Sequence, residues 1–233
     1  MFVKYNFSFM STISDNLRKI KESVPPGVKI IAVSKSMSPE KILEAYHSGH
    51  KIFGENRVQE LTVKYYDLPK DIEWHLIGHL QTNKVKHIVP FVSLIHSADS
   101  FKLLMEINNL AGKINRVVSC LLQIHIAQEE TKSGLSYAEA ETILQSEELQ
   151  QLKNVRIVGL MGMATLTEDE NQIRKEFASL RKFYDSFSLL PRVPGANCQF
   201  EILSMGMSSD YKIAIEEGSN MIRIGSAIFG ERK

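Results

Sequence analysis

The stretch Lys29-Ile-Ile-Ala-Val-Ser-Lys35 begins the pattern that decides the fold of this chain. It is a short apolar run of β character that ends on an amine, and it shows little of the alternation typical of a half-exposed strand. Ser38 and Pro39 follow as an N-cap and a first helical residue, and Gly49 ends the helix that they begin. A buried strand that leads directly into a helix is the repeating unit of parallel α/β folds.

Similar apolar runs recur along the rest of the chain. We predict eight strands, at residues 29–35, 51–55, 73–78, 94–98, 119–126, 156–163, 201–205 and 221–229. The expected helices are one at about 11–23 before the first strand, one from Arg57 to Tyr66, one capped by Asp99 that runs to about Ala111, two with capping boxes at Ser136 and Thr167, and one capped by Ser208 that stops at Gly218.

Eight β–α alternations in 233 residues predict a (β/α)8 TIM barrel with an extra N-terminal helix. A doubly wound open sheet is the alternative architecture, but no Gly-x-Gly-x-x-Gly motif opens the first helix. No linker rich in Pro or Ser and no internal repeat divides the chain. We therefore expect one domain over residues 1–233.

Composition narrows the classes of partner and compartment. A formal net charge of +1 offers no electrostatic case for nucleic acid or for an anionic membrane. Cys120 and Cys198 match neither a disulfide framework nor a zinc spacing, so a reducing cytoplasm is expected. Residues 1–10 are interpreted as a leader into the first helix, since they lack the features of a signal peptide. No apolar run approaches the roughly 18 residues that a membrane span needs.

Active groups of a parallel barrel gather at the carboxyl ends of its strands. Lys35 at such an end is well placed to form a Schiff base with an aldehyde cofactor. The loops after the last two strands are the expected phosphate site, because backbone N–H groups and hydroxyls meet there. The candidate binding residues are Lys35, Asn56, Ser204, Met205, Gly206, Arg223, Gly225 and Ser226.

Arg223 and Gly225 lie two apart on one strand, so they face the same side, while Ile222 and Ile224 face the other. An arginine that points into a barrel needs an acceptor. A pyridine nitrogen is one such acceptor, and the charged guanidinium would keep it unprotonated, which makes the ring a poorer electron sink.

Each candidate also has a purely structural interpretation. Lys35 is then a surface lysine, Asn56 a turn residue, residues 204–208 a turn and N-cap, and Arg223 an ion-pair partner. Their joint position at one face of a barrel favours the functional interpretation. A zinc site at His75 and His79 is disfavoured, because their spacing suits a metal only on a helix. Ser34 and Lys35 are adjacent on a strand and point to opposite faces, which disfavours a Ser–Lys hydrolase.

Several motifs together resemble the pyridoxal phosphate homeostasis protein family. They are Ala32-Val-Ser-Lys35, Phe53-Gly-Glu-Asn-Arg-Val-Gln-Glu60, Trp74-His-Leu-Ile-Gly-His-Leu-Gln-Thr-Asn-Lys84, Lys132-Ser-Gly-Leu135, Gly159-Leu-Met161, Leu203-Ser-Met-Gly-Met-Ser208 and Ile222-Arg-Ile-Gly-Ser-Ala-Ile-Phe-Gly230. The resemblance is collinear over about residues 12–231, nearly the whole chain.

The resemblance implies a barrel like the N-terminal domain of alanine racemase, with pyridoxal 5′-phosphate (PLP) as its cofactor. It implies a covalent imine on Lys35, an arginine facing the pyridine nitrogen at Arg223, and Asn56 beside the ring. Its phosphate contacts fall on Ser204, Gly225 and Ser226. The sequence departs from the family at His125, where asparagine is usual, and at Ser36-Met37, where threonine or glycine is usual.

The resemblance also bears on activity. Alanine racemase adds a C-terminal β domain that supplies a catalytic tyrosine, whereas this chain ends at Lys233, right after the eighth predicted strand. Racemisation needs two bases, and Lys35 is the one that we find. We therefore expect a monomeric, cytoplasmic PLP carrier or regulator in vitamin B6 and amino-acid homeostasis, which passes the cofactor to apo PLP-dependent enzymes. The alternatives are a weak PLP-dependent amino-acid racemase and a phosphosugar enzyme that uses Lys35 as an aldolase-type lysine.

Overall fold

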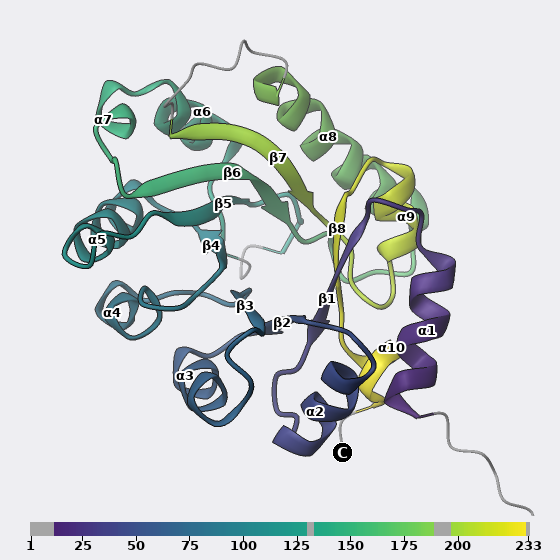
Figure 1. Cartoon of the computed structure of the whole chain (residues 1–233). Helices are drawn as coiled ribbons and strands as arrows, with labels where there is room; N and C mark the ends of the chain where they lie inside the picture. Colours follow the sequence, from purple (N-terminus) through teal and green to yellow (C-terminus); the bar gives the residue numbers. More distant parts are fainter. Residues whose placement is uncertain (1–11, 130–132, 189–196, 232–233) are drawn as a thin grey trace, which may run out of the picture.

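Eight parallel strands close into a barrel in chain order, and helices surround it (Figure 1). The computed structural model describes residues 12–129, 133–188 and 197–231. The strands are β1 (Lys29–Val33), β2 (Ile52–Glu55), β3 (Glu73–Leu76), β4 (Leu94–Ala98), β5 (Val118–Ile124), β6 (Val155–Gly162), β7 (Cys198–Ser204) and β8 (Met221–Ile224). β8 pairs with β1 and closes the ring, so the predicted TIM-barrel architecture is confirmed.

The helices lie between the strands, with α1 before β1 and α10 after β8. They are α1 (Ile13–Ser23), α2 (Pro39–His47), α3 (Val58–Asp67), the 3-10 turn η1 (Thr82–Lys84), α4 (Val85–Ile88), α5 (Phe101–Gly112), α6 (Tyr137–Gln145), α7 (Glu147–Gln150), α8 (Glu170–Ser188), α9 (Tyr211–Glu216) and α10 (Ser226–Phe229). No helix in the described part of the chain is both long and apolar enough to cross a membrane. The expected leader at residues 1–10 and Lys132 of one motif lie outside the described residues.

Six of the eight strands end earlier than predicted, and the ends of β1 and β8 matter most for the site. β1 stops at Val33, so Lys35 lies in a turn. β8 stops at Ile224, and the apolar run after it forms α10. The backbone of Gly225 leaves the extended region, with φ −112° and ψ −79°, and this turns the chain into the helix. An apolar run alone does not distinguish a short strand from a buried helical turn.

Helix caps are partly as predicted. The Ser136 capping box is present, with Glu139 reaching back to the N-cap. The helix α5 is capped by Ser100 rather than by Asp99. At α8 the carboxylate of Asp169, and not a box from Thr167, accepts hydrogen bonds from the first backbone N–H groups of the helix. Shifts of one or two residues arise because several neighbouring side chains are able to cap the same turn.

Apolar side chains fill the space on both sides of the barrel wall. The large cluster between strands and helices includes Trp74, Phe53 and Phe177, all nearly fully buried. A smaller cluster inside the barrel contains Leu94, Val158 and Met221 with three others. The inner cluster takes its members from β1, β4, β5, β6 and β8.

Candidate functional site

A cavity of about 610 Å³ lies at the carboxyl ends of the strands. Five of the eight predicted binding residues line it: Lys35, Asn56, Arg223, Gly225 and Ser226. They come from the segments after β1, β2 and β8 and from β8 itself, which meet only because the barrel is closed. The volume lies within the range of small-molecule sites, roughly 300–1,000 Å³.

The other three predicted residues lie beside the cavity and do not line it. Ser204 and Met205 are fully buried. Gly206 has φ +94°, and a Cβ there would lie 2.8 Å from the Cα of Tyr211, so only glycine fits this turn. The turn instead brings the following residues, Met207, Ser208 and Ser209, to the cavity.

Ser209 is not among the residues predicted for the site, and Ser208 is predicted as a helix cap. The Ser208 hydroxyl instead accepts a hydrogen bond from the backbone N–H of Gly225 at 3.2 Å, which ties the loop after β7 to the end of β8. The available signal was their position after the seventh strand, where phosphate sites of such barrels form.

The backbone next to Lys35 adopts an uncommon conformation. Ser36 has φ +62°, in the left-handed region that residues with a side chain rarely occupy. Its N–H donates to Oε1 of Glu60 at 2.6 Å, which holds this turn in place. Strain of this kind persists where the surrounding structure fixes it, and it is concentrated at functional sites.

A buried ion network supports the residue on the other side of Lys35. The Nζ of Lys64 donates to the carbonyl of Ser34 at 2.7 Å, to Oε1 of Glu55 at 2.8 Å and to Oε1 of Glu60 at 2.7 Å. The Ser34 hydroxyl also donates to Glu55, at 2.6 Å. These contacts fix the chain before and after Lys35, so they restrict where its side chain starts.

Burial and pairing act in opposite directions on the two acids of this network. Burial raises the pKa of Glu55, and its contacts with Lys64 and Ser34 only partly offset that effect. Glu60 is less buried, and although burial alone would raise its pKa, hydrogen bonds from Lys64 and from the Ser36 N–H lower it overall. Glu60 is therefore held as a carboxylate.

Arg223 lies inside the barrel and is only 4% exposed. Its Nη1 donates to the carbonyl of Ser204 at 2.9 Å and to the Ser204 hydroxyl at 2.7 Å, and its Nη2 donates to the carbonyl of Gly162 at 3.0 Å. Burial lowers the pKa of Arg223 to about 10, so the guanidinium remains charged at neutral pH. Three hydrogen bonds hold this charge in one orientation at the cavity wall.

A chain of buried side chains continues from Arg223. The Ser204 hydroxyl lies 3.2 Å from Nδ1 of His96, and Nε2 of His96 lies 3.0 Å from Nδ1 of His75. Burial lowers the pKa of His75 to about 3 and that of His96 well below its ordinary value, so both rings are neutral at pH 7. The metal-site hypothesis paired His75 with His79, whereas His79 is exposed and its Nδ1 lies 3.1 Å from Oδ2 of Asp99.

Two further positions clarify the walls of the cavity. A Cβ on Gly78 would lie 2.4 Å from the carbonyl oxygen of Asn56, so glycine is required for this loop to approach Asn56. His125, where the sequence departs from the family, is not among the residues that line this cavity. Its Nε2 instead lies 2.9 Å from the carbonyl of Glu129.

The chain matches known proteins along nearly its whole length. The family model for the alanine racemase N-terminal domain matches residues 10–233. A pyridoxal phosphate homeostasis protein of Aquifex aeolicus is 40% identical over 228 residues, which cover 96% of this chain and 97% of that protein. PipY of Synechococcus elongatus, solved with PLP bound, has a TM-score of 0.83 at 37% identity and covers 94% of this chain and 100% of that one.

The closed barrel and the family model define the class, a barrel of the alanine racemase N-terminal type. The chain belongs to the pyridoxal phosphate homeostasis protein family. An alanine racemase of Clostridium difficile is similar in fold alone, with 14% identity and a TM-score of 0.75, covering 96% of this chain and 57% of that one.

Proposed function

We propose that this chain binds PLP in the cavity of about 610 Å³ and acts as a carrier or regulator in vitamin B6 homeostasis. The observation that carries the proposal is that one cavity combines an amine, an anchored guanidinium and three hydroxyls. The relatives named for pyridoxal phosphate homeostasis and the PLP complex of PipY support it.

The residues of the cavity fit the three reactive parts of PLP. Lys35 offers an amine for the aldehyde. Ser208, Ser209 and Ser226 offer hydroxyls for the phosphate, in the loops after β7 and β8 where such barrels bind it. Arg223 offers N–H donors, which suit the lone pair of a pyridine nitrogen.

Lys35 would hold the cofactor covalently. Its Nζ attacks the aldehyde carbon, a carbon–nitrogen double bond forms, and the carbonyl oxygen leaves as water; hydrolysis reverses the step and releases the cofactor. When bound, PLP supplies an electrophilic carbon and an electron-accepting ring. The ion network on both sides of Lys35 keeps the amine positioned for this exchange.

Arg223 would limit the chemistry of the bound ring. Arginine donates hydrogen bonds and accepts none, so a ring nitrogen that faces it remains unprotonated. Three hydrogen bonds prevent the guanidinium from turning away. An unprotonated ring withdraws electrons weakly, which suits a protein that keeps a cofactor and delivers it to apo-enzymes.

Covalent attachment has a direct test. After incubation with PLP and reduction with borohydride, mass spectrometry of the digested wild type should show one phosphopyridoxyl group, on the peptide that contains Lys35. Lys35→Ala should lose this adduct, because the amine that forms the bond is gone. Lys51→Ala removes an exposed lysine paired with Asp71 and should retain it.

An adduct on another lysine in the wild type would contradict the assignment of Lys35. Absence of any adduct would favour the phosphosugar interpretation of the same lysine. Full retention of the adduct in Lys35→Ala would exclude both interpretations.

A racemase would need a second acid–base group in the cavity. Apart from Lys35 and Arg223, the titratable side chain among the described lining residues is Glu231. We expect L-alanine incubated with the PLP-loaded protein to yield no more D-alanine than with Lys35→Ala, as measured by chiral chromatography. D-alanine formation that disappears in both Lys35→Ala and Glu231→Gln would identify a racemase instead.

A further inference from the structure

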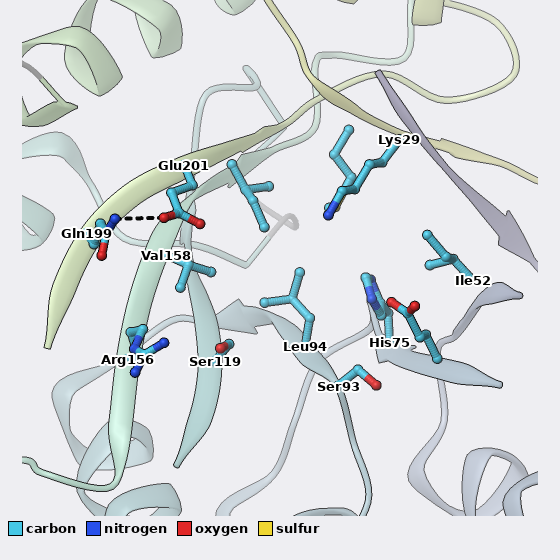
Figure 2. A pocket seen from close by; sticks show the side chains of 13 residues that line it. Lys29, Ile52, His75, Ser93, Leu94, Ser119, Arg156, Val158, Gln199 and Glu201 are labelled. Atoms are coloured by element: carbon cyan, nitrogen blue, oxygen red, sulfur yellow. Dashed lines mark hydrogen bonds between the residues drawn. The ribbon is translucent and has the colours of Figure 1, made fainter. Parts of the chain in front are cut away.

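A second cavity lies at the opposite end of the barrel, among the amino-terminal residues of the strands (Figure 2). Its volume is about 220 Å³, below the usual range of drug-sized sites, so it suits only a small molecule. Figure 2 shows Lys29 and His75 on one side and Arg156, Gln199 and Glu201 on the other. None of these residues lines the cavity at the carboxyl ends.

Two cations and two anions surround this second cavity, and the Glu201 carboxylate accepts a hydrogen bond from Nε2 of Gln199 at 2.7 Å. Lys29 and Arg156 are cationic, Glu73 and Glu201 are anionic, and all four are exposed. No ion pair joins any of the four to another residue in the ranges that the structure describes. A simple anion or cation would meet one like charge for each opposite one. Each side holds one charge of each sign, Lys29 with Glu73 and Arg156 with Glu201, so a molecule that carries both charges finds an opposite charge for each of its own.

His75 contributes a directed hydrogen bond to this cavity. Arg223 donates to the Ser204 hydroxyl, and the acceptor available to that hydroxyl within the described structure is Nδ1 of His96. The ring proton of His96 is then on Nε2, and this N–H donates a hydrogen bond to Nδ1 of His75. The remaining proton of His75 therefore lies on Nε2, the ring nitrogen on the side away from His96.

The Nε2–H of His75 has no acceptor among the described residues. His75 is 4% exposed and lines the cavity. Lys29 lies on the same side (Figure 2) and its charge acts on His75. A carboxylate between these two groups would receive one N–H donor and one ammonium.

We propose that the cavity at the amino-terminal end of the barrel binds a small zwitterion, a free α-amino acid. Its carboxylate lies against His75 Nε2–H and Lys29, and its ammonium group faces Glu201 on the opposite side. This site shares no lining residue with the cavity that contains Lys35.

The proposal is tested by NMR of the full chain carrying 15N-labelled histidine, with glycine as the probe. The ring signals of His75, assigned with His75→Gln, should shift and saturate as glycine is added. Sodium acetate and methylammonium chloride each carry one of the two charges and should bind at least about tenfold more weakly. Sodium chloride at equal ionic strength should leave the signals in place.

Variants identify the location of the site. Glu201→Gln should weaken glycine binding about tenfold, whereas Glu141→Gln, an exposed glutamate on α6, should not. Lys35→Ala should keep the full glycine response, which separates this site from the proposed PLP site. The proposal is overturned if sodium chloride reproduces the shift, if acetate binds as tightly as glycine, or if Glu201→Gln behaves like Glu141→Gln.

Discussion

Replacing Lys64 by alanine is expected to destabilise the protein by about 3–5 kcal/mol, measured by urea unfolding at pH 7.5. Lys64 is 6% exposed and Glu55 is fully buried, so the variant leaves a carboxylate in the interior without its cation. Removal of one partner of a buried pair costs far more than the pair itself contributes. The carbonyl of Ser34 also loses its donor.

A second substitution separates the charge effect from loss of packing. In Lys64→Met combined with Glu55→Gln, neither member of the buried pair carries a charge, so we expect most of the lost stability to return. Lys51→Ala removes an exposed lysine and should have a much smaller effect. A loss in Lys64→Ala no greater than in Lys51→Ala would show that the network contributes little to stability.

Acidification from pH 8 to pH 5 is expected to cost about 2 kcal/mol of unfolding free energy for each buried histidine. Burial lowers the pKa of His50 to about 4, that of His75 to about 3, and that of His96 well below its ordinary value. The unfolded chain takes up these protons below about pH 6.5 and the folded chain does not. Stability is therefore complete above that pH and falls as the pH drops toward the folded values.

Variants make this prediction specific. His50→Gln keeps a donor for the carbonyl of Ile52 and should remove about a third of the loss, measured by urea unfolding at several pH values between 8 and 5. His87→Gln changes an exposed histidine and should leave the pH profile as it is. Burial raises the pKa of Glu55, so this residue stabilises the folded chain as the pH falls and offsets part of the loss. Glu55 is present in both variants, so the difference between their pH profiles reports on His50 alone. Equal profiles in both would contradict the assignment.

Element type was predictable along this chain because both faces of each strand are buried. Parallel strands inside a barrel read as continuous apolar runs, and all eight appear near the expected positions. Where the apolar run continued past a strand, as after Ile224, the pattern could not locate the end. That boundary depends on the backbone of Gly225, which hydrophobicity does not record.

The candidate site was predictable to the extent that topology determined it. Lys35, Asn56 and Arg223 lie at strand ends, and a closed barrel brings such ends together. The choice between Ser204, the last residue of β7, and Ser208 in the loop after it depended on the left-handed turn at Gly206 and its packing against Tyr211. No spacing rule contains that information.

By itself, the sequence determined the β–α order, the barrel and the lysine at the mouth of its first strand, because these follow from local apolar patterns and from family motifs. Only the tertiary structure decided which polar groups meet. Lys64 reaches Ser34 across 30 residues, and His96 reaches Ser204 across 108. Hydrogen bonds act over about 3 Å, so contacts between distant segments exist only once the barrel has closed.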